Sequence, residues 1–409
     1  MNTSSIRRAT RLGSLLGAAA LVAMTAAACS SGQSSTSDAG GTSSPTAAAA
    51  TAAGATAAGA TAAGVAHAQS VLAGIGGDVT SFSPVGSAIS GLAAHRGETV
   101  TYIPIFLEAG YFSVSAANLK QAAAQVGINL EVCDGKAVPS TVAACFTQAI
   151  SDHSAAIITD SVPLAEAPNS YAAAASAKIP VVMLNNDTPI SGSLAPYVRS
   201  LSVGQVSYAA EGADAIIAAS GGKANVLAVL SADNGETELA AAAFQKEMAT
   251  YCPGCSVTTV TYQTAELEDV PTEVSTALLR HPDTNYVFAQ FDSPLTPAVI
   301  AGIQQAHKTS AIKLIAEGGD LGGLQRVADG QQFADIANDP AYSAWSGLDY
   351  ALRLIVNPNA AEPAYQIPAR VFYASTVKPL TLTDSAWIAG SWYTNGSFRK
   401  MYESLWGVS

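Results

Sequence analysis

The side chains best suited to chemistry in this sequence follow runs of residues that favour β-strands. Asp160 follows the run 155–159, Asp292 follows a run that ends at Gln290, and Asp320 lies in the glycine-rich loop 318–323. Carboxylates can act as general acids or bases, and they can accept hydrogen bonds from a polar ligand. Asp is also a frequent helix N-cap, so a structural role for Asp160 and Asp292 is an equal alternative.

Acidic residues alone do not identify an enzyme. The sequence contains no Gly-x-Ser-x-Gly motif, no His-Glu-x-x-His motif and no phosphate-binding loop with Gly-Lys-Ser or Gly-Lys-Thr. The glycine-rich stretch 74–77 and the loop at Gly318 both lack the later acid of a dinucleotide-binding fingerprint. We expect no catalytic residue and no cofactor, although spacing alone does not exclude a glycosidase with paired carboxylates.

No metal site is expected either. The histidines lie far apart rather than at ligand spacing: His67, His95, His153, His281 and His307. The segment Asp233-Asn-Gly-Glu236 suggests a calcium loop, but it does not meet the twelve-position ligand pattern of such loops. We interpret it as a turn and a helix cap.

The cysteines predict disulfides in an oxidising compartment. Cys252 and Cys255 flank Pro-Gly in a predicted turn between a helix and a strand, and Cys133 with Cys145 is the natural second pair. A redox motif would need a strand before the cysteines and a helix after them, which is the opposite order.

The start of the chain predicts export. Residues 1–28 combine three arginines with a short apolar run, and small residues precede Cys29, as in a lipoprotein signal peptide whose cysteine becomes lipid-modified. The alternative is an ordinary cleaved signal with an incidental cysteine. Residues 29–97 are rich in Ser, Thr, Ala and Gly and predict a flexible tether.

Charge excludes two classes of partner. The formal net charge is −12, and removal of residues 1–28, which hold three arginines and no acid, would make it −15. An acidic exported domain is a poor partner for nucleic acid or anionic lipid. No later run is long and apolar enough to cross a bilayer.

From about Glu98 onward, short β-rich runs alternate with amphipathic helices, and the alternation restarts after Ser202. Two successive series of this kind predict an α/β fold with two doubly wound parallel-sheet lobes. Ligands of open α/β sheets bind beyond the carboxyl ends of the strands, so those ends are the expected site.

Several segments follow one another in an order that is typical of a known family: Tyr111-Phe112, Val132–Lys136, Ile179–Asn186, Gly221–Val226, Tyr251–Cys255, Phe288–Asp292 and Tyr402–Gly407. Together they resemble the type I periplasmic binding proteins of the ribose- and galactose-binding kind, and most closely an actinobacterial lipoprotein subgroup of sugar ABC transporter substrate-binding proteins. The resemblance implies a three-strand hinge with crossings near Val203, Ala337 and Ala369. It places 98–203 plus 338–369 in the N-terminal lobe and 204–337 plus 370–409 in the C-terminal lobe.

The same resemblance implies a set of ligand-binding positions. Tyr111 and Phe112 would stack on a sugar face, unless they are core aromatics. The other positions are Asp160, Asn185, Asn186, Asp187, Glu238, Phe291, Asp292, Asp320 and Asn338. Three of them depart from the family pattern: Asn186 and Glu238 stand where arginines are expected, and Phe291 stands where an Asn is expected. Because no mapped position is Lys or Arg, an anionic ligand is disfavoured.

The expected function is therefore an exported, lipid-anchored receptor that binds a sugar or a sugar-like compound between its lobes and delivers it to a membrane ABC permease. A monomer is expected. The alternatives are a ligand sensor for a membrane signalling partner, a receptor for a cationic or nitrogenous solute, and a glycoside-processing enzyme. A transcription regulator of related fold is excluded, because no helix-turn-helix precedes Glu98.

Overall fold

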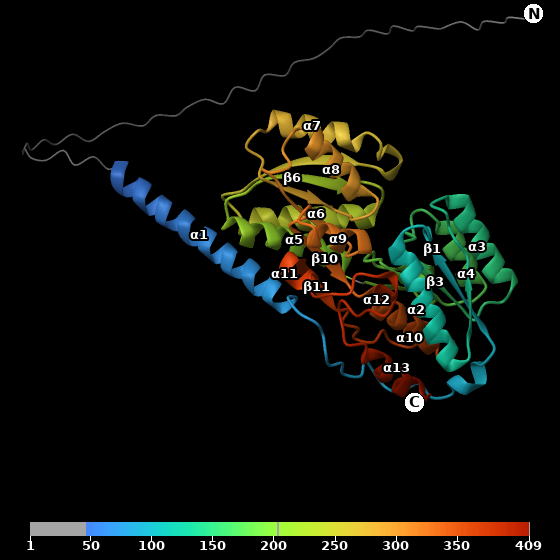
Figure 1. Ribbon diagram of the computed structural model, residues 1–409. Coiled ribbons are helices and arrows are strands. Elements are labelled where there is room, and N and C mark those ends of the chain that lie inside the picture. The colour runs from blue at the N-terminus through green and yellow to red at the C-terminus, as the bar shows by residue number, and fades with distance from the viewer. Residues whose placement is uncertain (1–45, 203, 409) are drawn as a thin grey trace, which may run out of the picture. The chain divides into compact units, whose positions relative to one another are not determined.

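The computed structural model describes residues 46–202 and 204–408, with side chains from Gly59 onward apart from Gln205 (Figure 1). The predicted signal peptide 1–28, Cys29 and the first part of the predicted tether lie outside the described residues. Within the described part, no helix has both the length and the apolar character needed to cross a membrane.

The first lobe is built on a parallel sheet of order β2-β1-β3-β4-β5. Its strands are β1 (Thr99–Pro104), β2 (Asn129–Val132), β3 (Ala156–Asp160), β4 (Val181–Leu184) and β5 (Val198–Leu201). The connecting helices are α2 (Gly110–Val126), α3 (Pro139–Ser151) and α4 (Pro168–Ser176). Every residue of β3 and β4 is buried, as expected for parallel strands covered on both faces.

The second lobe is built on a sheet of order β11-β10-β9-β8-β6-β7. Its strands are β6 (Asn225–Ser231), β7 (Ser256–Tyr262), β8 (Tyr286–Ala289), β9 (Lys313–Glu317), β10 (Ala334–Asn338) and β11 (Ala369–Tyr373). Its helices are α5 (Gln205–Ser220), α6 (Gly235–Tyr251), α7 (Val270–Arg280), α8 (Leu295–Gln305) and α9 (Leu321–Ala328). β11 pairs antiparallel with β10, and the other pairs are parallel.

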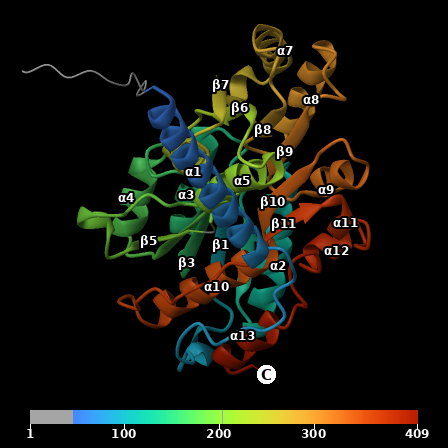
Figure 2. The same ribbon diagram turned by 90° about the vertical axis from the view of Figure 1, so that its left-hand side faces the viewer.

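Alternation along β6 explains the layers of this lobe. Val226, Ala228 and Leu230 belong to the core cluster that α5 and α6 cover, whereas Leu227 and Val229 belong to the cluster covered by α7 and α8. Successive strand residues face opposite sides of a sheet, so one apolar strand serves two cores. Figure 2 shows α7 and α8 apart from α5 across this sheet. The predicted α/β fold with two parallel-sheet lobes is confirmed.

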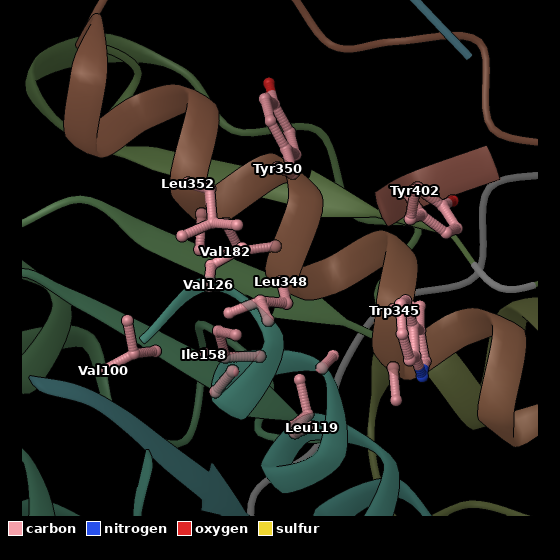
Figure 3. Close-up of a cluster of buried hydrophobic side chains, with 14 of the residues drawn as sticks. Val100, Leu119, Val126, Ile158, Val182, Trp345, Leu348, Tyr350, Leu352 and Tyr402 are labelled. Carbon is pink, nitrogen blue, oxygen red and sulfur yellow. The ribbon is translucent and has the colours of Figure 1, made fainter. Parts of the chain in front are cut away.

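The core of the first lobe centres on α10 (Pro340–Val356), which follows β10 of the second sheet in the sequence but packs against β3, β4 and α2. Figure 3 shows Leu348 and Leu352 of this helix directed toward Ile158, Val182 and Val126. The apolar side chains come from strands and helices that are distant in sequence, so this cluster forms only when the chain returns from the second lobe.

The C-terminal residues divide between the lobes, which differs from the predicted assignment of 370–409 to one lobe. α11 (Ala374–Val377) and α12 (Asp384–Ile388) follow β11, but α13 (Phe398–Trp406) packs on α10 in the core of the first lobe. Trp406 stacks on Trp345 with ring centroids 5.2 Å apart, and its indole N–H donates to Asp349. The amphipathic pattern of α13 buries Phe398, Tyr402, Leu405 and Trp406 there.

The predicted flexible tether is corrected over residues 46–97. Residues Thr46–Gly74 form helix α1, because Ala is the strongest helix former and the glycines are widely spaced. Ala68 and Leu72 are buried in the core of the second lobe. After α1 the backbone pairs with both lobes: Val371 donates to the carbonyl of Ile75, and Ile89 donates to that of Leu405. A segment whose composition cannot form a core of its own can still pack against the core of a folded lobe.

Both predicted disulfides are confirmed. Cys133 and Cys145 are joined at a Cα–Cα distance of 5.7 Å, and Cys252 and Cys255 at 5.3 Å. The second pair follows α6 and precedes β7, which is the predicted helix, turn and strand order.

The α13 contact predicts a specific loss of stability. We expect Trp406→Ala to lower the free energy of unfolding by about 3–5 kcal/mol, because it leaves a cavity against Trp345 and removes the indole N–H that donates to Asp349. Trp406→Phe should cost less, since it keeps an aromatic ring. Urea denaturation measures both. Equal stability of Trp406→Ala and the wild type would show that α13 does not hold the core.

A second prediction concerns the start of α10. Asp339 is fully buried and caps this helix by accepting from the amide of Ala341, and burial raises the pKa of its carboxyl to about 7. The folded chain therefore holds a proton that the unfolded chain releases near pH 4, so this residue makes the free energy of unfolding fall as pH rises from about 4 to about 7. Asp339→Asn keeps the cap oxygen but cannot titrate.

We expect Asp339→Asn to show a shallower fall of unfolding free energy with pH than the wild type, by up to about 1.4 kcal/mol per pH unit in that window. Chemical denaturation at half-unit pH steps measures the difference. Parallel curves for the two proteins would contradict a raised pKa at this position.

Candidate functional site

The two lobes are bonded to each other where their strands end. Glu236, at the start of α6, accepts hydrogen bonds from the backbone amides of Asp187 at 2.8 Å and Thr188 at 2.9 Å, in the turn after β4, and also from the Thr188 hydroxyl. Glu236 is only 5 % exposed. Hydrogen bonds to a buried carboxylate are the stronger kind, so this contact fixes the distance between the two sheet ends.

Asn234 explains why Glu236 stands at this point. Its side chain caps α6 by accepting from the amides of Glu236 and Thr237. The predicted turn and helix cap at Asp233–Glu236 is thus confirmed. The helix dipole also favours an acid in the first turn of α6. From this position the Glu236 carboxylate reaches the other lobe.

In the first lobe, Asp160 is the centre of a buried polar cluster at the ends of β1, β3 and β4. It accepts from the Tyr102 hydroxyl at 2.7 Å and from the Asn185 amide at 2.6 Å. Burial raises the pKa of its carboxyl to about 6, although both hydrogen bonds favour the ionised form. Asn185 has a φ of 54°, a left-handed conformation that Asn tolerates better than most residues.

The predicted aromatic pair divides into two roles. Phe112 is buried and packs against Tyr111 and Phe106 with centroids 5.5 and 5.7 Å apart, as a core aromatic would. Tyr111 directs its hydroxyl toward Asn185, Asn338 and Ser343, and burial raises its pKa. Tyr111 therefore connects the first-lobe cluster to the crossing between β10 and α10, where Asn338 also donates to Ser343.

In the second lobe, a carboxylate cluster follows β8 and β9. Asp292 forms an ion pair with Arg326 at 3.0 Å and accepts from the amide of Asp320 at 3.1 Å. Asp320 in turn caps α9 through the amide of Gly323, and burial together with Asp292 raises its pKa to about 6. A Cβ at Gly323 would lie 2.0 Å from Asp292, so only glycine allows this approach.

Glu317, the last residue of β9, is a buried acid that forms no ion pair among the described residues. It is 2 % exposed, and neither carboxylate oxygen has a hydrogen-bond partner among the described residues. Burial raises its pKa well above the usual value, and Asp292 and Glu211 raise it further. A polar group this deep and unsatisfied is costly, so its retention points to a role beyond packing.

Two tyrosines complete this region. Tyr208 of α5 lies close enough to Tyr111, Tyr393 and Glu317 for their charges to raise its pKa, after burial itself. Tyr393 donates to the carbonyl of Gly319 at 3.2 Å. Aromatic rings with hydroxyls thus come from both lobes to the strand ends.

The structure separates the predicted positions into three groups. Asp160, Asn185 and Asn338 meet through Tyr111 in the first lobe, and Asp292 and Asp320 meet in the second. Asp187 contributes its amide to Glu236, while burial raises the pKa of its carboxyl. Asn186 is 1 % exposed; its oxygen accepts from the Thr188 amide, and its side-chain nitrogen has no partner in the described part of the chain.

Two predicted positions do not join this network. Glu238 is exposed on α6, and Phe291 packs against the core beneath β8. Sequence reasoning missed Glu236, Glu317, Tyr208, Tyr393 and Arg326. Glu236 lies within the segment 233–236 that we interpret as a cap, and Glu317 directly precedes the glycine-rich loop. Both come shortly after the end of a predicted strand, and that position could have identified them as site residues. No mapped position is an arginine, but Arg326, which was not mapped, brings a guanidinium to Asp292.

Comparison with known proteins supports a family and a fold. The family model described as periplasmic binding protein domain matches residues 100–358. No curated protein matches the chain. Solved structures are similar over most of their length, and each shares less than a quarter of its residues with this chain, which shows the fold alone.

Three of them illustrate the likeness. The 5-methylthioribose transporter solute-binding protein from Thermotoga lettingae is 16 % identical, with a TM-score of 0.61, and the match covers 72 % of this chain and 93 % of that one. A solute-binding protein from Agrobacterium vitis bound to α-D-tagatopyranose is 19 % identical, with a TM-score of 0.61 and coverage of 70 % and 97 %. One from Burkholderia graminis with D-arabinose is 20 % identical, with a TM-score of 0.60 and coverage of 70 % and 98 %. With its two parallel-sheet lobes and the family match over more than half its length, this chain belongs to the periplasmic binding protein domain family.

Proposed function

We propose that this chain is an exported receptor that captures a small polar solute, a sugar or a sugar-like compound, between its lobes and delivers it to a membrane ABC importer. The observation that carries the proposal is the direct bonding of the two lobes through Glu236 at the ends of their strands. Family membership supports it, as do the sugars bound by the three structural relatives.

The chemistry of the strand ends suits a neutral, hydroxyl-rich ligand. Tyr111 and Tyr208 can offer ring faces to C–H groups, and their hydroxyls can donate or accept. Asn185, Asn338 and Asp292 add amide and carboxylate groups at the same level of the two sheets. A sugar needs this mixture of a flat apolar surface and several hydrogen-bond partners.

Lobe closure provides the signal for delivery in this proposal. Glu236 bonds the turn 185–188 only when the lobes are close, and a ligand that contacts both lobes favours that state. An importer that recognises the closed state would then distinguish loaded from empty receptor. A membrane sensor would use the same signal, so it remains the alternative partner.

Glu317 supports a second candidate ligand, a cationic or nitrogenous solute. Its two unpartnered oxygens lie near Asp292 and Glu211, and Arg326 is already paired with Asp292. A bound ammonium or amine would place positive charge where the lobe lacks it, and the neighbouring tyrosine rings could add cation–π contacts.

Export and anchoring belong to the same proposal. They rest on the sequence of residues 1–29, which resembles a lipoprotein signal, and on the family, whose members act outside the cytoplasm. We propose no catalytic residue, because Asp160 serves as a hydrogen-bond acceptor, Asp320 as a cap and Asp292 as an ion-pair partner. A glycoside-processing role would need one of them to act on a bound sugar.

A thermal-shift screen tests the ligand class. Ligand at a hundred times its dissociation constant should stabilise the chain by about 2.7 kcal/mol, which raises the melting temperature by several degrees. We expect a shift with a neutral sugar or polyol. A shift with amines alone would identify the second candidate, and no shift across sugars, polyols, amines, amino acids and nucleosides would contradict a receptor role.

A matched pair of variants tests the lobe contact. Glu236→Gln places an N–H against the amides of Asp187 or Thr188, so we expect the dissociation constant of the ligand found in the screen to rise about tenfold or more. Small-angle scattering should show more open lobes. Glu238→Gln, two residues along α6 and exposed, is the control and should change neither quantity. Equal effects of the two variants would refute the role of Glu236.

A further inference from the structure

Three potential metal ligands meet between α1, α5 and α6 of the second lobe. His67 of α1, Asp214 of α5 and Glu247 of α6 each offer a ligand atom, and these atoms lie within 4.8 Å of one another. His67 and Glu247 are in hydrogen-bond contact at 2.9 Å although 180 residues separate them. The scattered histidines of the sequence gave no sign of this cluster.

Asp214 provides an independent reason to look for a ligand. It is 2 % exposed, and its Oδ1 is buried without any hydrogen-bond partner in the described chain. A buried, unsatisfied carboxylate oxygen costs free energy unless a donor or a cation compensates it. One turn earlier on the same helix, Oε2 of Glu211 is also buried and unpartnered. Two buried carboxyl oxygens of α5 therefore lack a hydrogen-bond partner among the described residues.

The surrounding contacts hold His67 in place. Its ring stacks on Tyr251 with centroids 3.7 Å apart and planes 7° apart, and Tyr251 lies one turn after Glu247 on α6. Helix α1 approaches this point closely, because a Cβ at Gly64 would lie 1.9 Å from the Tyr251 carbonyl oxygen. A ring fixed by stacking and by a glycine contact is pre-oriented for coordination.

We infer that His67, Asp214 and Glu247 form a binding site for a divalent zinc ion that fastens α1 to the second lobe. Imidazole nitrogens and carboxylate oxygens both bind zinc, and three protein ligands leave a fourth position open to water. Calcium and magnesium prefer oxygen ligands alone. At zinc bond lengths of about 2.0–2.2 Å, tetrahedral ligand atoms lie ~3.4 Å apart, so the observed cluster needs only small side-chain shifts.

This site is independent of the proposed sugar site. His67 precedes the residues that the family model matches, so the third ligand comes from the chain's own N-terminal extension. The role that follows is mechanical: zinc would join α1 to α5 and α6 whether or not the lobes close. The alternative is a plain hydrogen bond between His67 and Glu247 with no metal.

Calorimetric titration of the metal-stripped full chain, purified without a histidine tag, with zinc chloride tests the inference. We expect one site with micromolar or tighter affinity, no comparable binding of calcium or magnesium, and protection of α1 against limited proteolysis. His67→Gln and Asp214→Asn should each weaken zinc binding at least tenfold. Circular dichroism confirms that the variants fold, and Glu247→Gln serves if either does not.

His95→Gln is the matched control. His95 also lies beside a carboxylate, Glu98 at 3.1 Å, but without a third ligand. It should leave zinc binding unchanged. Absence of a one-site zinc isotherm, or equal binding by His67→Gln, Asp214→Asn and wild type, would overturn the inference and leave the His67–Glu247 hydrogen bond as the explanation. The sugar-binding proposal would stand in either case.

Discussion

The contact between Glu236 and the turn 187–188 sets the geometry on which the rest of the site depends. Parallel strands direct their carboxyl ends to one edge, so each lobe gathers its polar groups at one edge of its own sheet. The Glu236 carboxylate brings the two edges together by satisfying two backbone amides of the opposite lobe. With that contact made, tyrosines and acids from both sheets share one buried environment, where burial raises the pKa of unpaired acids such as Glu317.

Much of the fold could be predicted, because it depends on local periodicity. The apolar runs at 180–184 and 286–290 predict β4 and β8, and the helical spacing from Ser113 predicts α2, whose observed start lies at Gly110. The prediction of a flexible tether was wrong for a physical reason. Low hydrophobicity correctly implied that residues 46–74 cannot form a core alone, but Ala-rich sequence favours a helix that α5 and α6 can stabilise by docking.

The site was less predictable than the fold, because a position error of one or two residues reverses the direction of a side chain. Glu238 and Glu236 differ by two positions on a helix, which is about 200° of rotation, so one is exposed and the other bonds the opposite lobe. Phe291 and Asp292 are adjacent, and only the second turns toward Arg326. Tyr208, Arg326 and the His67 cluster depend on contacts between distant segments, which no spacing in the sequence records.

The lobe closure proposed for this chain places a mechanical constraint on the N-terminal segment. Residues 75–97 join α1 on the second lobe to β1 in the first, and they bond the chain close to where it crosses between the lobes: Asp78 pairs with Arg370 at the start of β11, and Val79 bonds the backbone of Tyr393. Contacts near a hinge change little when lobes rotate, whereas contacts at the strand ends change most. If the lobes close as proposed, the segment can stay bonded to both of them throughout, and the free energy of closing then depends mainly on the Glu236 contact and on the ligand.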